Sequence, residues 1–395
     1  MSSLLPGTPG GIGGRGDLVR RHNLGLVLRS VHLAPKTRSA LTRISGLNRS
    51  TIGALVSDLV ERRLVVEEVA SPLGTVGRPS PVVRPSDDPV AIAVNPEVDA
   101  VTVALVRLGG RVLAKERVPF ERTPSPDDAA RAAAAAARRL VADAGPRAIV
   151  VGAGAAVPGI VRRSDGHVRL APNLDWRDAP FAEALRSALD MDAWAANDAA
   201  LGAQAEWFFG AGRGVDDLVY VHGGVSGIGG GVVSGGVLLS GANGHAGEIG
   251  HVAVRRHGHP DKLALRGTLE SEVRRSRLLD VLGLDRAGPD DFEAALLASD
   301  DPAVQTEVRR QIDHLAFGVA AAVGMLNPDR IVLGGFLSAL VAKDRARLER
   351  AVTDRALPLG GETVDIRRAE LGSDLLDIGA AELPFSRLFA DPLAA

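Results

Sequence analysis

Arg49, Ser50 and Thr51 are consecutive in the sequence and bring together a guanidinium and two hydroxyls. A guanidinium can donate two parallel hydrogen bonds to the edge of a guanine, and hydroxyls can bond bases or phosphates. This chemistry requires the three side chains to point outward from a rigid element. Asn48, which precedes them, is a favourable helix N-cap. The first turn of a helix is therefore the element that we expect here.

Two helices joined at a glycine are expected to position these side chains. Thr37 can cap the first helix, and Gly46 allows the left-handed turn that ends it. The apolar residues of this helix recur at helical spacing: Ala40, Leu41 and Ile44. The second helix has one apolar stripe, made of Ile52, Leu55, Val56, Leu59 and Val60. Residues 37–64 are predicted to form a helix-turn-helix whose second helix presents its first turn to the major groove.

Residues 64–83 read as two short strands around a turn rich in glycine and proline, which is typical of a wing. Arg78 lies between Gly77 and Pro79 and is a candidate probe of the minor groove or of a phosphate. Together with the helices, this segment provides the candidate DNA-contacting residues Arg38, Asn48, Arg49, Ser50, Thr51 and Arg78.

The charge of the chain is distributed unevenly. Residues 15–84 contain twelve Lys or Arg and five Asp or Glu, a net +7, whereas the whole chain of 395 residues has a net charge of −2. The remaining segments therefore sum to −9. Positive charge concentrated on one segment favours a polyanionic partner such as duplex DNA. The alternative is a small helical domain that binds a protein partner.

The length of the chain predicts more than one domain. We expect a disordered tail at residues 1–16, the DNA-binding domain at 17–84, a linker at 85–89 and a larger body at 90–395. No apolar run is long enough for a membrane span, and the N-terminus lacks the pattern of a signal peptide. The chain has no cysteine, which excludes disulfides and thiolate metal sites and is in keeping with the cytoplasm.

The same order of predicted strands and helices occurs twice in the body. Three strand-like stretches between residues 90 and 118 are followed by a helix that Ser125 can cap, and then by a buried strand near residue 150. The same order begins again near Asp217 and ends with a helix near Leu375. We therefore expect an α/β body made of two similar lobes, with a ligand cleft between them.

Eight motifs in a fixed order resemble the ROK family, whose name stands for repressor, open reading frame and kinase. They are the GRP of the wing, VPGIV at 157–161, APNLDW at 171–176, AANDAALGAQAEW at 195–207, GGVSGIGGGVV at 223–233, GANGHAGEIGHVAV at 241–254, GTLE at 267–270 and NPDRIVLGG at 327–335. The resemblance runs from Arg20 to the C-terminus and is nearest to the xylose- and N-acetylglucosamine-type repressors. It implies a duplicated actin-like, hexokinase-like (ribonuclease H-like) body.

The resemblance also implies a sugar site. The residues that match the hexose-binding positions of the family are Asn173, Asn197, Asp198, Glu248, His251 and Glu270. Carboxylates and amides suit this task because they form paired hydrogen bonds with neighbouring hydroxyls. Glu248 and His251 are three residues apart and would face the same way in a helix or a tight turn. The alternative is a polar loop whose groups bond only to one another.

One departure from the family concerns ATP. Family kinases have an Asp-x-Gly-Gly-Thr turn whose backbone approaches the phosphates, whereas this chain has Asn95-Pro96-Glu97-Val98-Asp99. This stretch lacks glycine, loses an amide donor at Pro96 and adds two acids. We therefore expect no enzyme activity and no catalytic residue, and we interpret Asp198, which matches the kinase general base, as a sugar ligand only.

A second departure concerns zinc. The family usually carries three cysteine ligands beside a histidine that matches His251, and this chain has Asp261, Leu263 and Thr268 at the cysteine positions. No metal and no cofactor are expected. The alternative is that His257, His259 and Asp261 act as substitute ligands together with His251.

These observations favour a DNA-binding transcriptional regulator of carbohydrate-related genes, a repressor rather than an activator, controlled by a sugar or sugar derivative in the cleft. Its partners would be a double-stranded DNA operator, the sugar effector and further copies of the chain in a homodimer or homotetramer. Two alternatives stay open: an ATP-dependent sugar kinase with an added DNA-binding domain, and a regulator that answers to a protein partner.

Overall fold

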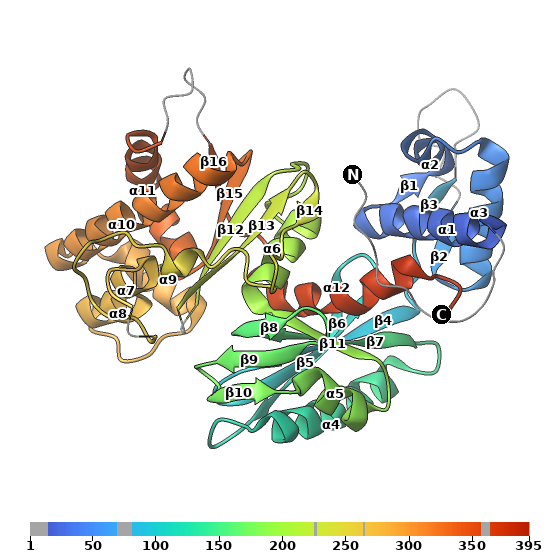
Figure 1. Cartoon of the computed structure of the whole chain (residues 1–395), viewed down its shortest axis with the longest axis horizontal. Coiled ribbons are helices and arrows are strands. Elements are labelled where there is room, and N and C mark those ends of the chain that lie inside the picture. The colour runs from blue at the N-terminus through green and yellow to red at the C-terminus, as the bar shows by residue number, and fades with distance from the viewer. Residues whose placement is uncertain (1–14, 69–80, 225–226, 264, 357–363, 395) are drawn as a thin grey trace.

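The computed structural model describes residues 15–68, 81–224, 227–263, 265–356 and 364–394 (Figure 1). The chain begins with a small helical domain that carries a three-stranded sheet of order β1-β3-β2. Its elements are α1 Arg15–Leu33, β1 Lys36–Thr37, α2 Arg38–Ser45, α3 Arg49–Glu61, β2 Val65–Glu68 and β3 Val82–Pro85. We call residues 15–85 the N-terminal domain.

The predicted pair of helices is confirmed. The Thr37 hydroxyl accepts a hydrogen bond from the Ala40 amide at the start of α2, and Gly46 ends this helix with a φ of 69°. The Asn48 side chain caps α3 by accepting from the Thr51 amide. Most of the predicted apolar stripe is buried, but Ile44 and Val60 are 52% and 39% exposed. Val60 was therefore assigned wrongly to the packed stripe, and Ile44 follows the helical spacing without being buried.

Helix α1 was not predicted. It begins at Arg15, two residues inside the tail that we expected at 1–16. Its buried residues are spaced i, i+3, i+4 and i+7, which gives one apolar face: Leu24, Val27, Leu28 and Val31. The other face is rich in arginine and histidine. Burial of this apolar stripe against the rest of the molecule is what stabilises the helix.

The body consists of two lobes whose sheets have the same topology. The first sheet has the order β11-β7-β4-β5-β6, and the second, read in the same sense, has the order β16-β15-β12-β13-β14. In each sheet, the first three strands pair antiparallel in sequence order. The fourth strand then pairs in parallel with the first, and the fifth pairs in parallel with the fourth. This agreement confirms the predicted duplication of an α/β unit. No helix in the described part of the chain is long and apolar enough to cross a membrane.

The strands of the two sheets have the following bounds: β4 Pro89–Pro96, β5 Ala100–Arg107, β6 Arg111–Pro119, β7 Ile149–Val157 and β11 Ala193–Asn197, then β12 Leu218–Gly223, β13 Ile228–Ser234, β14 Val237–Leu238, β15 Arg330–Gly335 and β16 Asp365–Arg368. A small third sheet belongs to the first lobe and contains β8 Ile160–Arg162, β9 His167–Ala171 and β10 Trp176–Ala179.

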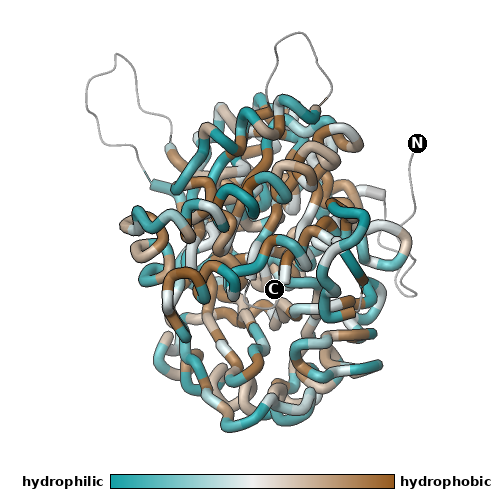
Figure 2. The backbone as a smooth tube through the Cα atoms, turned by 90° about the vertical axis from the view of Figure 1, so that its left-hand side faces the viewer, coloured by the Kyte–Doolittle hydropathy of each residue, from teal (hydrophilic) through white to brown (hydrophobic). Residues whose placement is uncertain are grey.

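Helices cover both faces of the first sheet. Helices α4 (Pro126–Ala144) and α5 (Phe181–Leu189) pack on one face, and α12 (Leu375–Ala390) packs on the other beside α6 (Asp198–Phe209). The second lobe carries α7 Leu269–Glu272, α8 Arg275–Leu282, α9 Pro289–Ala298, α10 Pro302–Leu326 and α11 Phe336–Thr353. Teal and brown stretches alternate along the outer helices in Figure 2, as expected for amphipathic helices that cover a core.

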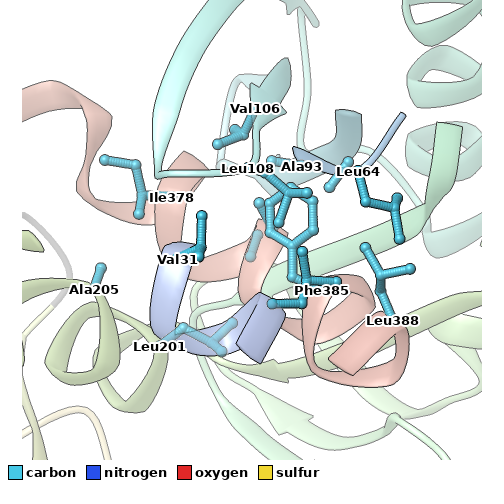
Figure 3. Close-up of a cluster of buried hydrophobic side chains, with 14 of the residues drawn as sticks. Val31, Leu64, Ala93, Val106, Leu108, Leu201, Ala205, Ile378, Phe385 and Leu388 are labelled. Carbon is cyan, nitrogen blue, oxygen red and sulfur yellow. The ribbon is translucent and has the colours of Figure 1, made fainter. Parts of the chain in front are cut away.

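The N-terminal domain shares a hydrophobic core with the body. Figure 3 shows this cluster, in which Val31 of α1 and Leu64 lie with side chains of the first sheet, of α6 and of α12. The other labelled residues are Ala93 and Val106 of the first sheet, Leu108 of the turn after β5, and Leu201, Ala205, Ile378, Phe385 and Leu388 of the two helices, and together they exclude water from the joint. The N-terminal domain is therefore packed onto the body.

The connection between the two parts is short. We expected a linker at 85–89, but Pro85 ends β3 and Pro89 begins β4, so only residues 86–88 connect them. Ser86 and Asp88 are buried. The Asp88 carboxylate accepts hydrogen bonds from Arg63 of the N-terminal domain and from Arg147 of the first lobe. This segment therefore links the N-terminal domain to the first lobe through hydrogen bonds of the Asp88 carboxylate.

Candidate functional site

A cavity of about 220 Å³ lies between the two lobes. All six candidate sugar-binding residues line it: Asn173, Asn197, Asp198, Glu248, His251 and Glu270. They come from both lobes and from the start of α6, which connects the lobes. The volume is below the roughly 300–1,000 Å³ typical of drug-sized ligands. The cavity therefore suits a small polar molecule.

The start of α6 positions two of these residues. The Asn197 Oδ1 accepts from the Ala200 amide at 2.9 Å and caps the helix, while its Nδ2 donates to the Gly159 carbonyl at 3.0 Å. Asp198 is the first residue of α6, and its Oδ1 accepts from the Ala199 amide at 2.8 Å. Burial raises the pKa of Asp198 to about 7, and the charge of Glu248 adds to the rise. Asp198 therefore titrates near neutral pH.

Glu248 precedes and His251 ends a short 3-10 helix, η1 (Ile249–His251), and both residues line the cavity. The His251 Nδ1 lies 3.4 Å from the Asp261 Oδ2 and 4.0 Å from the Glu270 Oε1. Burial raises the pKa of Glu270, although the neighbouring His251 and Lys262 oppose this effect. The cavity thus holds several hydrogen-bonding groups that lie within about 4 Å of one another.

Three lining residues were missed from the sequence: His222, His245 and Lys262. The Tyr220 hydroxyl lies 2.8 Å from the His222 Nδ1, and burial lowers the pKa of His222 to about 4, so this ring is neutral at pH 7. Lys262 of the second lobe donates to Asn173 of the first. His245 lies in the glycine-rich motif at 241–254, and His222 directly precedes the glycine-rich motif at 223–233, which was a usable signal. Lys262 carries no such signal.

The residues at the zinc position do not fit a structural zinc ion. Leu263 has no donor atom, and the Thr268 hydroxyl donates to Asp261 at 3.1 Å. Ligand atoms of His251, Asp261 and Glu270 lie within 4.8 Å of one another, whereas a structural zinc ion takes four ligands. Of the proposed substitute ligands, Asp261 joins His251 in this group, whereas His257 and His259 are exposed and do not join it within the described residues.

A second cavity, of about 310 Å³, adjoins the first and shares Gly224, Gly227, Lys262 and Glu270 with it. The turn Asn95-Pro96-Glu97-Val98-Asp99 lines neither of these two cavities. Its Glu97 amide donates to the Ala100 carbonyl at 2.8 Å. Arg117 pairs with the carboxylates of Glu97 and Asp99 at 3.1 and 2.7 Å. The turn is therefore held by this backbone hydrogen bond and by the ion pairs with Arg117.

The candidate DNA-contacting residues divide into two groups. Arg49 and Ser50 are exposed on the first turn of α3, and Asn48 holds this turn by accepting from the Thr51 amide and the Ser50 hydroxyl. Arg38 instead donates two hydrogen bonds of 2.6 Å to Glu67 of β2, so its guanidinium braces the domain. Arg78 lies outside the described residues.

Comparisons with known proteins agree with these features. The model of the ROK family matches residues 91–385. A putative xylose repressor of Caldicellulosiruptor sp. is 24% identical over 96% of this chain and 99% of its own length. An N-acetylglucosamine repressor of Shigella flexneri is 28% identical over 92% of this chain and 93% of its own. Similarity over 96% of the chain necessarily extends through the N-terminal domain.

A glucokinase of Thermotoga maritima is 32% identical, but over 62% of this chain and 81% of its own length. A crystal structure described as a ROK family transcriptional regulator, homologous to the E. coli MLC protein, superposes with a TM-score of 0.76 at 20% identity, over 95% of this chain and 98% of that one. This likeness concerns the fold, and it covers nearly the whole of both chains.

Proposed function

This chain belongs to the ROK family, and we propose that it is a DNA-binding transcriptional repressor of carbohydrate-related genes, whose affinity for DNA is set by a sugar or sugar derivative in the interlobe cavity. The relatives that match nearly its whole length are repressors of xylose and N-acetylglucosamine systems by name. The matching glucokinase covers a smaller part of the chain.

We propose that the N-terminal domain is a winged helix-turn-helix. Helices α2 and α3 meet at Gly46, and β2 and β3 flank the segment proposed as the wing. In this class of domain the N-terminal turn of the second helix enters the major groove. Arg49 and Ser50 lie at that turn and are exposed, and Arg49 forms no salt bridge among the described residues. An arginine in this setting is available for a guanine edge or a phosphate.

The observation that supports the proposal most directly is that helix α6 runs from the cavity to the N-terminal domain. Asn197 and Asp198 begin this helix at the interlobe cavity. At its other end, the Phe209 ring packs edge-on against His32 of α1 with centroids 5.1 Å apart, and the Arg29 guanidinium of α1 lies 5.7 Å from the centre of the Phe208 ring. Twelve helical residues span about 18 Å. One rigid helix therefore connects the cavity with the N-terminal domain.

Helix α12 packs closely against both α6 and α1. A Cβ atom on Gly379 of α12 would lie 2.6 Å from the Leu201 carbonyl oxygen of α6. A Cβ atom on Gly25 of α1 would lie 1.9 Å from the Phe389 carbonyl oxygen of α12. Because the three helices touch backbone to backbone, a displacement of α6 has to move its neighbours. A sugar that binds two positions of the lobes with different affinity would thereby change the orientation of the DNA-reading helix.

We further propose a homodimer or homotetramer. Two copies related by a two-fold axis would present two α3 helices to a palindromic operator. The half-sites would then lie about 34–36 Å apart, or a multiple of this distance. A change in the orientation of each N-terminal domain would alter this spacing and so weaken or strengthen the binding of the pair.

The second candidate is a sugar kinase with an added DNA-binding domain. The glucokinase relative and the adjoining cavity of about 310 Å³ favour it, because a phosphate donor needs room beside the sugar. The turn at Asn95–Asp99 opposes it, since a proline and two acids replace the glycines that a phosphate requires. A coupled assay for ATP turnover with D-glucose, D-xylose and N-acetyl-D-glucosamine separates the two candidates: turnover at an enzyme-like rate would establish the kinase.

The DNA-binding surface is tested with DNA that the protein itself selects from a random duplex library. Arg49→Ala should weaken binding to the selected duplex by about tenfold or more, in line with the roughly 1–3 kcal/mol of one bidentate base contact. Arg309→Ala is the matched control, because Arg309 is an exposed arginine on α10, far from α3 in the fold. Equal affinity of the two variants would show that α3 does not read the DNA.

A further inference from the structure

We infer that Asp261 fixes the orientation of His251 in the cavity and thereby replaces a structural metal ion by a network of hydrogen bonds. This makes Asp261 a positioning residue for the sugar site, and in that respect the inference rests on the function proposed above. The network itself can be examined with neither sugar nor DNA present.

The loop around Asp261 is held by hydrogen bonds to the Asp261 carboxylate. The Asp261 side chain is 1% exposed. Its Oδ1 accepts from the Leu263 amide at 2.8 Å and from the Leu265 amide at 2.9 Å, and its Oδ2 accepts from the Thr268 hydroxyl at 3.1 Å. The Asp261 amide donates to the Leu265 carbonyl at 2.7 Å. A carboxylate with this many donors fixes the course of the loop, as a metal ion does when it gathers several ligands.

The same carboxylate faces the ring of His251. Its Oδ2 lies 3.4 Å from the His251 Nδ1, and the Glu270 Oε1 lies 4.0 Å from that nitrogen. Two acceptors beside Nδ1 favour the tautomer that carries its proton there. The Nε2 atom is then left as a hydrogen-bond acceptor. An imidazole whose tautomer is fixed in this way offers a sugar hydroxyl one defined partner.

A metal ion would compete poorly for this position. Three hydrogen-bond donors already occupy the Asp261 carboxylate, and they would have to be released for it to bind a metal in full. Leu263 provides no ligand atom, and the Thr268 hydroxyl is engaged with Asp261. The chemistry of the donors therefore favours a loop that is held without zinc.

The loop also delivers the next residue in the chain to the cavity. Lys262 crosses from the second lobe and donates to Asn173 of the first. Burial lowers the pKa of Lys262, and the charge of Glu270 opposes this effect. Asp261 thus organises two residues that line the cavity, His251 directly and Lys262 through the backbone.

The test uses the full-length protein and the substitution Asp261→Asn, which keeps the shape of the side chain. An asparagine can still accept from the Leu263 and Leu265 amides through its Oδ1, but its amide group then presents hydrogens to the His251 Nδ1. The ring should respond by moving its proton to Nε2. Asp285→Asn is the matched control, because Asp285 is exposed and lies on a different loop.

The readout is the ¹⁵N spectrum of protein labelled on histidine, with the His251 signals assigned from a His251→Gln variant. We expect protonated Nδ1 and unprotonated Nε2 in the wild type and in Asp285→Asn, and the reverse in Asp261→Asn. We also expect less than one zinc ion per ten chains after purification, and a melting temperature that chelators do not change.

Three results would overturn the inference. They are a His251 proton on Nε2 in the wild type, the same His251 signals in Asp261→Asn as in the wild type, and stoichiometric zinc whose removal lowers the melting temperature. None of these measurements depends on an effector or an operator. A failure of the proposed regulatory function would therefore be seen separately, as absence of DNA binding with the His251 spectrum unchanged.

Discussion

The imidazole of His32 and the carboxylate of Glu382 form a hydrogen bond of 2.9 Å between residues that are 350 positions apart in the sequence. Both side chains are almost fully buried, at 0% and 1% exposure. The His32 Nδ1 accepts from the Gly109 amide at 3.0 Å, so the ring proton is on Nε2 and is donated to Glu382. One histidine of α1 is thus bonded to α12 and to the turn between β5 and β6.

Removal of the Glu382 carboxylate should destabilise the protein strongly. Glu382→Ala leaves the His32 Nε2 hydrogen buried without a partner, and we expect a loss of about 3 kcal/mol or more in the free energy of unfolding. Glu382→Gln keeps an acceptor oxygen in place and should cost clearly less. Urea unfolding of the two variants is the measurement, and equal losses would mean that the bond to His32 contributes little.

A side chain at position 25 should disturb the contact between α1 and α12. The Cβ of Gly25→Ala would lie 1.9 Å from the Phe389 carbonyl oxygen, so the helices must separate. We expect a lower melting temperature and a weaker effect of the sugar on DNA affinity. Gly324→Ala is the control, because a Cβ there meets no atom within 4 Å and should stabilise α10 by roughly 0.5–1 kcal/mol. A wild-type sugar response in Gly25→Ala would show that coupling takes another route.

The stability contributed by Asp198 should depend on pH. Its pKa in the folded protein is about 7, raised from 3.8 chiefly by burial. The raised pKa means that the stability present at low pH is lost as the pH rises from about 4 through 7. Asp198→Asn removes this dependence. As the pH rises from about 5 to 8, the free energy of unfolding of the wild type should therefore fall by on the order of 2–3 kcal/mol relative to that of Asp198→Asn. A constant difference across this range would contradict the assignment.

Arg38 should matter for the integrity of the N-terminal domain more than for contact with DNA. It forms a bidentate ion pair with Glu67 that joins α2 to β2. Both Arg38→Ala and Glu67→Gln remove this pair, but only the second makes the domain more positive. We expect both variants to unfold at lower temperature and to bind DNA more weakly. If Glu67→Gln binds DNA more tightly than the wild type while Arg38→Ala binds it more weakly, the bracing role is contradicted and Arg38 acts as a direct contact.

Much of the fold was open to sequence reasoning because its signals are local. Thr37, Gly46 and Asn48 mark the ends of two helices by capping and by a positive φ, and these effects act within a few residues. Helix α1 carried the same kind of signal in its spacing of Leu24, Val27, Leu28 and Val31, but it was overlooked. Ile44 and Val60 follow helical spacing and are nevertheless exposed, because spacing defines a face without saying what covers it.

Only those site residues that lie within family motifs could be predicted from the sequence. The six residues of the sugar site lie in recognisable stretches, and all of them reach one cavity. Lys262 and Asp261 lie outside such stretches, and their roles depend on contacts to Asn173 and Thr268 that the folded loop creates. The bond between His32 and Glu382 is a similar case, since it joins α1 to α12 across 350 positions of the sequence. Long-range pairs of this kind require the three-dimensional structure.

The most direct test is the affinity for a self-selected DNA duplex, measured by fluorescence anisotropy with and without the sugar that most raises the melting temperature. The wild type should bind the duplex at moderate salt, and the sugar should change the dissociation constant by about fivefold or more. Glu248→Ala, which alters the cavity, should bind the same duplex without responding to the sugar. Failure of the wild type to bind duplex DNA, or a sugar response that persists unchanged in Glu248→Ala, would contradict the account.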